Sequence, residues 1–140
     1  MSLVLALFAL SALSGGAAPV AAPTVTAAAI PSQQAAVAAA NQWLALVDAS
    51  DWTASYNATA NSFRSVNTVD RWADASKNVR VPLGAVQSRQ LVTADFAPAP
   101  PEGYWVVKFR TSFAGRAAAI ETLALVWEND GWRVVGYTIE

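Results

Sequence analysis

The sequence contains no cysteine and no histidine. Without cysteine the chain has no disulfide, no thiolate nucleophile and no residue for a lipid anchor. Without histidine it lacks the commonest general base and the commonest transition-metal ligand. We therefore expect no metal site, no cofactor and no histidine-assisted catalytic triad.

Charged residues are also scarce and nearly balanced, with nine basic and ten acidic side chains and a net charge of −1. No run of basic residues could neutralise a phosphate backbone, so nucleic-acid binding is not expected. No basic amphipathic stripe suits a membrane surface. The partners that remain are a small anionic or apolar ligand, or another protein.

The N-terminus begins with an apolar stretch, Leu3–Leu13, that is followed by small residues. It is too short to span a bilayer, which takes about 20 apolar residues, and it is typical of a secretory signal peptide. No basic residue precedes it, and a buried helix is the alternative, which Gly15-Gly16 and the following prolines disfavour. Cleavage could follow Ala17 or Ala29. We assign residues 1–31 to a signal peptide and an Ala/Pro-rich spacer, and expect an exported protein, periplasmic or extracellular.

Three helices are predicted in the first half of the remaining chain, because apolar residues there recur with a helical period. Asn61–Asn67 has no such period and is interpreted as a connection. The third helix is expected to end at Pro82-Leu83-Gly84. The residues predicted to cap the helix N-termini are Ser32, Asp51 and Thr68.

After Ala85 the hydrophobic period changes to two, which predicts strands. Turns are expected at Ala114-Gly115-Arg116 and at Asn129-Asp130-Gly131, the latter a strong hairpin signal. Residues 32–140 should thus form one α+β domain, with three helices packed on a curved, four-stranded antiparallel meander. The predicted strands are Val86–Phe96, Tyr104–Phe113, Ala119–Glu128 and Trp132–Ile139, and Val135, Tyr137 and Ile139 are expected on one face of the last.

Several short segments lie between Ala36 and Ile139 in a characteristic order and spacing. They are Trp43–Ala49, Asp51-Trp52, Tyr56, Arg80–Gly84, Arg89, Tyr104 with Phe109–Phe113, Glu121-Thr122 and Asp130–Tyr137. Together these segments resemble the bacterial domain-of-unknown-function family 4019. The resemblance implies export from Gram-negative cells and a fold similar to the cystatin-like or NTF2-like α+β roll; the family carries no established activity.

A roll of this kind often has a pocket between its helices and sheet, so polar residues on apolar strands are the candidate site. Arg110 and Glu121 could face each other across a hairpin as a cross-strand ion pair. Alternatively, arginines could grip an anionic ligand, since a guanidinium binds a carboxylate with two hydrogen bonds. The candidate ligand-binding residues are Arg80, Arg89, Arg110, Glu121, Tyr56 and Trp72.

Six tryptophans are many for a small domain. We interpret most of them as core residues that fill the space left by an alanine-rich helical layer. Trp127 and Trp132, at the last hairpin, are the pair expected to be exposed. Aromatic platforms for sugars or quaternary amines are the alternative use.

These patterns favour a non-catalytic exported domain that binds a small ligand or a protein partner. This interpretation predicts that Glu121 is inaccessible and neutralised by Arg110. The alternative is an NTF2-like enzyme with Glu121 or a helix-end aspartate as base and an arginine as stabiliser, which predicts a solvent-reaching cavity with Glu121 at its base and a raised pKa. A third interpretation is a module that pairs with a second copy through an exposed sheet face.

Overall fold

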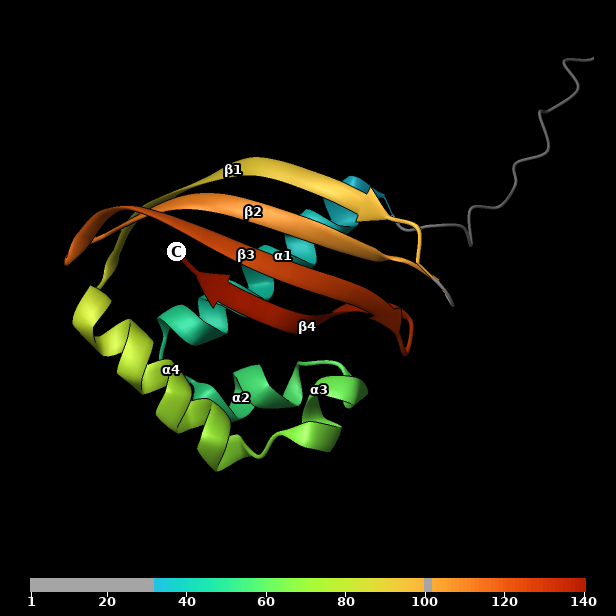
Figure 1. Cartoon of the computed structure of the whole chain (residues 1–140), viewed down its shortest axis with the longest axis horizontal. Coiled ribbons are helices and arrows are strands. Elements are labelled where there is room, and N and C mark those ends of the chain that lie inside the picture. The colour runs from blue at the N-terminus through green and yellow to red at the C-terminus, as the bar shows by residue number, and fades with distance from the viewer. Residues whose placement is uncertain (1–31, 100–101) are drawn as a thin grey trace, which may run out of the picture. The chain divides into compact units, whose positions relative to one another are not determined.

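The computed structural model describes residues 32–99 and 102–140, so the predicted signal peptide and spacer lie outside the described residues. The described residues belong to one compact unit, Pro31–Glu140. Helices come first and strands follow, as predicted (Figure 1). The elements are α1 (Gln33–Asp48), α2 (Trp52–Asn57), α3 (Asn61–Val66), α4 (Val69–Leu83), β1 (Val86–Ala97), β2 (Tyr104–Phe113), β3 (Arg116–Glu128) and β4 (Gly131–Ile139).

The three predicted helix caps are confirmed. The side chains of Ser32, Asp51 and Thr68 each accept a hydrogen bond from the backbone amide three positions ahead, at 3.3, 3.0 and 3.2 Å. Each bond satisfies an amide that has no partner within its helix. At the other end of α4, Gly84 has a φ of 74°, a left-handed conformation that favours glycine.

The helix count was wrong, because the predicted connection Asn61–Asn67 contains α3. This helix is only six residues long and none of its residues is buried, so it has no hydrophobic period to detect. Ala60 stands at its N-cap without a side-chain hydrogen bond. Tertiary contacts hold the segment instead: the Ala60 amide donates to the Val134 carbonyl of β4 at 2.8 Å.

The predicted antiparallel meander is confirmed, with strand order β1-β2-β3-β4. Asn129 and Asp130 have φ angles of 51° and 58°, the conformation of the tight hairpin turn expected there. On β2 the buried side chains alternate with exposed ones. Figure 1 shows α1 behind the sheet, while α2, α3 and α4 gather beyond the edge strand β4. No described helix is long and apolar enough to cross a lipid bilayer.

A bulge in β4 corrects the predicted face of that strand. Val134 pairs with Leu125 and Gly136 pairs with Ala124, so Val135 is an extra residue between them. An extra residue reverses the alternation of side chains beyond it. Val134, before the bulge, is therefore buried on the same face as Tyr137 after it, because their partners Leu125 and Leu123 share that face.

The core lies between α1 and the sheet. Ala36, Ala40 and Leu44 are fully buried and pack with the core residues Val107 and Leu123. Two alanines on this stripe let the helix approach the sheet closely. More of the tryptophans belong to the core than the sequence predicted.

Trp132, predicted to be exposed, is only 8% exposed. It contacts the half-buried Trp127 edge to face, with ring centroids 5.3 Å apart. The prediction of an exposed pair at the hairpin was wrong, because the sheet face that carries Trp132 is covered.

Candidate functional site

Polar side chains from six elements meet on the helix-covered face of the sheet. Each of the four strands contributes one of them, and α1 and α4 contribute one each. We call this set the polar network. Its members are Asp48 (α1), Arg80 (α4), Arg89 (β1), Thr111 (β2), Glu121 (β3) and Tyr137 (β4).

Glu121 lies at the centre of the polar network and has no exposed surface. Arg89 Nε donates to Glu121 Oε1 at 2.8 Å, and the hydroxyls of Thr111 and Tyr137 donate to the same carboxylate. A buried carboxylate requires such compensation, because burying a charge without partners is costly. Glu121 is therefore inaccessible and neutralised.

The predicted partner of Glu121 was wrong. Glu121 stands opposite Phe109 in the β2–β3 ladder, and Arg110 stands opposite Ile120. Neighbouring residues of a strand point to opposite faces, so the Arg110 side chain lies on the exposed face of the sheet. Arg89, two strands away from Glu121, supplies the positive charge instead.

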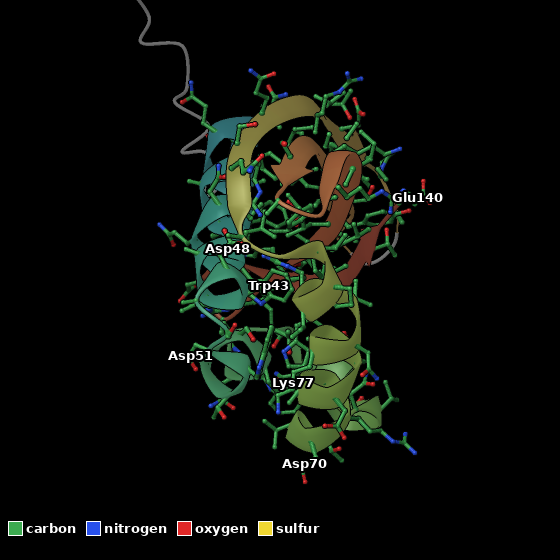
Figure 2. The ribbon with its side chains drawn as sticks, turned by 90° about the vertical axis from the view of Figure 1, so that its left-hand side faces the viewer. Trp43, Asp48, Asp51, Asp70, Lys77 and Glu140 are labelled. Carbon is green, nitrogen blue, oxygen red and sulfur yellow. The ribbon has the colours of Figure 1, made fainter. Side chains whose placement is uncertain are left out.

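Asp48 lies at the end of α1 (Figure 2). Its carboxylate forms ion pairs with both arginines of the network. Arg89 donates to its two carboxylate oxygens at 2.8 and 3.0 Å, and Arg80 donates at 2.6 Å. Burial acts to raise the pKa of Asp48, but the hydrogen bonds from Arg89 and Arg80 outweigh it and hold the pKa below its usual value. Asp48 is thus a negatively charged hydrogen-bond acceptor.

Arg89 and Tyr137 are held in their ordinary protonated forms. Burial opposes the charge of Arg89, yet its hydrogen bonds to Asp48 and Glu121 raise its pKa above the usual value. For Tyr137, burial, the charge of Glu121 and the hydrogen bond to Glu121 raise the pKa far above its usual value. The network pairs two arginines with two carboxylates and leaves neither carboxylate free as a base.

A pocket of about 320 Å³ lies between α4 and the end of β4, and we call it the α4–β4 pocket. Tyr137 belongs to both this pocket and the polar network, because its ring lines the wall while its hydroxyl binds Glu121. Ser76 is 7% exposed and its buried hydroxyl has no partner among the described residues. The lining residues are Trp72, Ala75, Ser76, Val79, Tyr137, Thr138 and Ile139.

The structure brings together only part of the predicted site. Arg80, Arg89 and Glu121 meet in the polar network, and Trp72 lines the α4–β4 pocket. Tyr56 does neither: its hydroxyl donates to the Asn67 carbonyl at 2.7 Å and ties α2 to the end of α3.

A smaller pocket of about 240 Å³ adjoins the open side of the network. Asp48 and Arg80 line it, and the Asp48 side chain is 27% exposed there. Both arginines are already bound by carboxylates, so an anionic ligand would have to compete with Asp48. Carboxylates of the protein itself thus occupy the two arginines that were predicted to bind an anionic ligand.

Three site residues were missed by sequence reasoning, namely Asp48, Tyr137 and Ser76. Asp48 lies four residues after Leu44, which puts both on one face of α1, and this spacing was a usable signal. Tyr137 was assigned to an apolar strand face. Ser76 was expected on the same helix face as Trp72 and Val79, and this spacing was a usable signal for the pocket that the three residues line.

No cluster of three or more acidic residues in the described ranges is placed to hold a metal ion. In a chain without cysteine and histidine, a cluster of carboxylates is the remaining means of binding a metal ion.

The comparisons with known proteins give one match. Residues 39–137 match the family described as protein of unknown function, DUF4019. Neither the curated proteins nor the solved structures include a match to this chain. The matched region runs from α1 to β4 and contains all six members of the polar network and the α4–β4 pocket residues up to Tyr137. This chain therefore belongs to the DUF4019 family.

Proposed function

We propose that this protein is an exported, non-catalytic binding domain with the architecture of a cystatin-like or NTF2-like roll. Its ligand is a small, mainly apolar molecule with one hydrogen-bonding group, held in the α4–β4 pocket. The apolar Leu3–Leu13 stretch supports export. The order of helices and strands supports the roll.

The observation that carries the proposal is the hydroxyl of Ser76. A buried hydroxyl without a partner costs about 1–3 kcal/mol, so native structures rarely leave one unmatched. Ser76 is in the wall of the α4–β4 pocket, where a bound molecule can supply the missing partner after rotation about a single side-chain bond. Trp72, Val79 and Ile139 supply aromatic and aliphatic surface around it.

The size of the pocket fits the same class of ligand. Its volume of about 320 Å³ lies at the lower end of the range for small-molecule sites, which is about 300–1,000 Å³. No aspartate, glutamate, lysine or arginine is among the lining residues. A ligand with a net charge would lose its hydration there without gaining a counter-charge.

A catalytic role is less well supported. A general base needs a carboxylate that can reach the substrate and accept a proton. Glu121 has no exposed surface, and Asp48 is bound by Arg80 and Arg89 with a lowered pKa. The charges in the polar network therefore stabilise the fold, and binding takes place beside it.

Native mass spectrometry of the mature protein, purified from its own compartment without refolding, tests the proposal. We expect an additional mass that disappears on denaturation. Ala75→Phe fills the pocket and should abolish this mass, whereas Lys77→Phe places the same ring on the exposed face of α4 and should keep it. A wild-type protein without extra mass, or an Ala75→Phe variant that retains it, would contradict the proposal.

The same spectrum also tests the remaining alternatives. A dimer mass that grows with protein concentration would support pairing with a second copy, and the mass of the mature chain identifies cleavage after Ala17 or Ala29.

A further inference from the structure

A second pocket lies on the other side of α1 from the polar network and has a volume of about 280 Å³. It is open to solvent between the middle of α1, the turn after α2 and the start of β4. We call it the α1–β4 pocket. The residues that line it include Gln42, Trp43, Leu46, Trp132, Arg133 and Val134.

The indole of Trp132 is the feature that distinguishes this pocket from an ordinary hollow in the surface. Trp132 is 8% exposed, and its buried Nε1–H has no hydrogen-bond partner within residues 32–99 and 102–140. The indoles of Trp43 and Trp72 show how the same fold treats this group elsewhere, since each donates to Ser55 at 2.9 Å. Trp105 also lacks a partner, but it does not line the α1–β4 pocket.

The charge around the α1–β4 pocket favours a ligand with acceptor oxygens. Arg133 borders it, and neither aspartate nor glutamate does. Gln42 is exposed at the rim and can donate through its amide. Trp43, Leu46 and Val134 form an apolar wall for the rest of the molecule.

We propose that the α1–β4 pocket binds a small monocarboxylate with an apolar body, whose carboxylate accepts a hydrogen bond from the Trp132 indole. Arg133 adds attraction for the negative charge, and the apolar wall holds the body of the ligand. This site differs from the α4–β4 pocket in place and in ligand charge, and it does not depend on the function proposed above.

The test uses 4-phenylbutyrate as the probe and 4-phenylbutylamine as its matched control, which has the same body but carries a donor-only cation. In ¹H–¹⁵N spectra the six tryptophans have separate indole signals that report hydrogen bonding. We expect 4-phenylbutyrate to shift the Trp132 indole signal, and 4-phenylbutylamine to bind at least about tenfold more weakly.

Two pairs of variants sharpen the test. Trp132→Phe removes the donor and should weaken 4-phenylbutyrate binding about five- to tenfold, whereas Trp105→Phe removes a second buried indole without a partner in the described residues and should not. If Trp132→Phe does not fold, Gln42→Glu places a negative charge at the exposed rim and should weaken binding by a similar factor. Asn41→Asp adds the same charge outside this pocket and should have little effect.

Four results would overturn the inference. Binding that survives Trp132→Phe, or no binding at millimolar probe, excludes the hydrogen bond. A signal change at Trp72 instead of Trp132 places the probe in the α4–β4 pocket, which would support the proposed function while refuting this site. An unmoved Trp132 signal in the bound state means that its indole N–H is directed at the ring of Trp127, which it meets edge to face.

Discussion

The helices α1 and α4 are held to the sheet by opposite means. The buried residues of α1 are the apolar side chains Ala36, Ala40, Trp43, Leu44 and Val47. The buried residues of α4 are Ser76 and Arg80, both polar. Apolar contact needs close approach over a large area, whereas an ion pair holds a helix at one point. This difference explains why the α4–β4 pocket opens beside α4, whereas the buried stripe of Ala36, Ala40 and Leu44 packs directly on the sheet.

The largest expected effect comes from breaking the centre of the polar network. Glu121→Gln removes a buried charge while keeping the shape of the side chain, and it leaves Arg89 with only Asp48 as counter-charge. We expect a loss of about 3–5 kcal/mol in the free energy of unfolding, measured by urea denaturation.

Glu102→Gln, at an exposed glutamate, is the control for that substitution and should change stability by less than about 0.5 kcal/mol. Equal stability of the two variants would show that the polar network contributes little to the fold.

Breaking the apolar attachment of α1 should cost about 3 kcal/mol. Leu44→Ala removes a fully buried side chain and leaves a cavity against the sheet. Leu46→Ala, on the same helix but half-buried, should cost less than half as much. Urea denaturation distinguishes the two, and similar losses would contradict the assignment of the core to one face of α1.

The polar attachment of α4 should fail locally. Arg80→Met keeps an apolar side chain of similar length but removes the guanidinium, with its ion pair to Asp48 and its contact with the Phe113 ring, while Asp48 retains Arg89. We expect a loss of about 2 kcal/mol, concentrated in α4, so that hydrogen exchange accelerates in α4 more than in α1. Uniform acceleration in both helices would refute the single-point attachment.

Tyr137 should make stability depend on alkaline pH. Its pKa in the folded state is raised above the unfolded value of 10.0, so the folded state binds the proton more tightly. Stability is then fully present below pH 10 and falls as pH rises above it, by up to about 1.4 kcal/mol per pH unit.

Tyr137→Phe should cost about 1.5 kcal/mol at neutral pH, because Glu121 loses one of its donors, and should remove that alkaline slope. Urea denaturation at several pH values between 7 and 11 measures both effects. An unchanged slope in the variant would mean that another group titrates.

The smallest expected effect is at Ser76. Ser76→Ala removes a buried hydroxyl that has no partner in the described part of the chain, so the ligand-free protein should keep or slightly gain stability, within about 1 kcal/mol. Thermal unfolding of the ligand-free protein measures this. A clear loss would show that the hydroxyl has a partner in solution, and the α4–β4 pocket would then offer a ligand no unmatched hydrogen-bonding group.

Local chemistry was sufficient to predict most of the elements of this fold. Ser32, Asp51 and Thr68 cap helices because a side-chain oxygen at that position accepts a hydrogen bond from a nearby backbone amide. The two residues of each contact are only three positions apart in the chain. The hairpin at Asn129 and Asp130 follows in the same way from residues that tolerate a positive φ. Segment α3 was missed because its stability comes from distant partners such as Val134.

The candidate site was predicted in its residue types but not in its pairing. Arg80, Arg89 and Glu121 were singled out as polar residues in apolar surroundings, and they do meet. Arg110 was chosen as the partner of Glu121 because the two flank one hairpin, but the register puts Phe109 opposite Glu121. A shift of one residue reverses every side chain of a strand, and the turn alone does not reveal it.

By itself, the sequence determined the α+β order of elements, the helix caps, the last hairpin and the exclusion of cysteine and histidine chemistry, because each depends on residue identity or on neighbours along the chain. Only the tertiary structure decided that Arg89 and Asp48 pair to balance the charges of the polar network. It also decided that a bulge at Val135 turns Tyr137 toward Glu121. Finally, it left the Ser76 hydroxyl and the Trp132 indole beside pockets without hydrogen-bond partners among the described residues. These features join residues far apart in the chain: Asp48 and Arg89 are 41 positions apart, and Arg80 and Tyr137 are 57. Register and packing set them, and neither is encoded in any single segment.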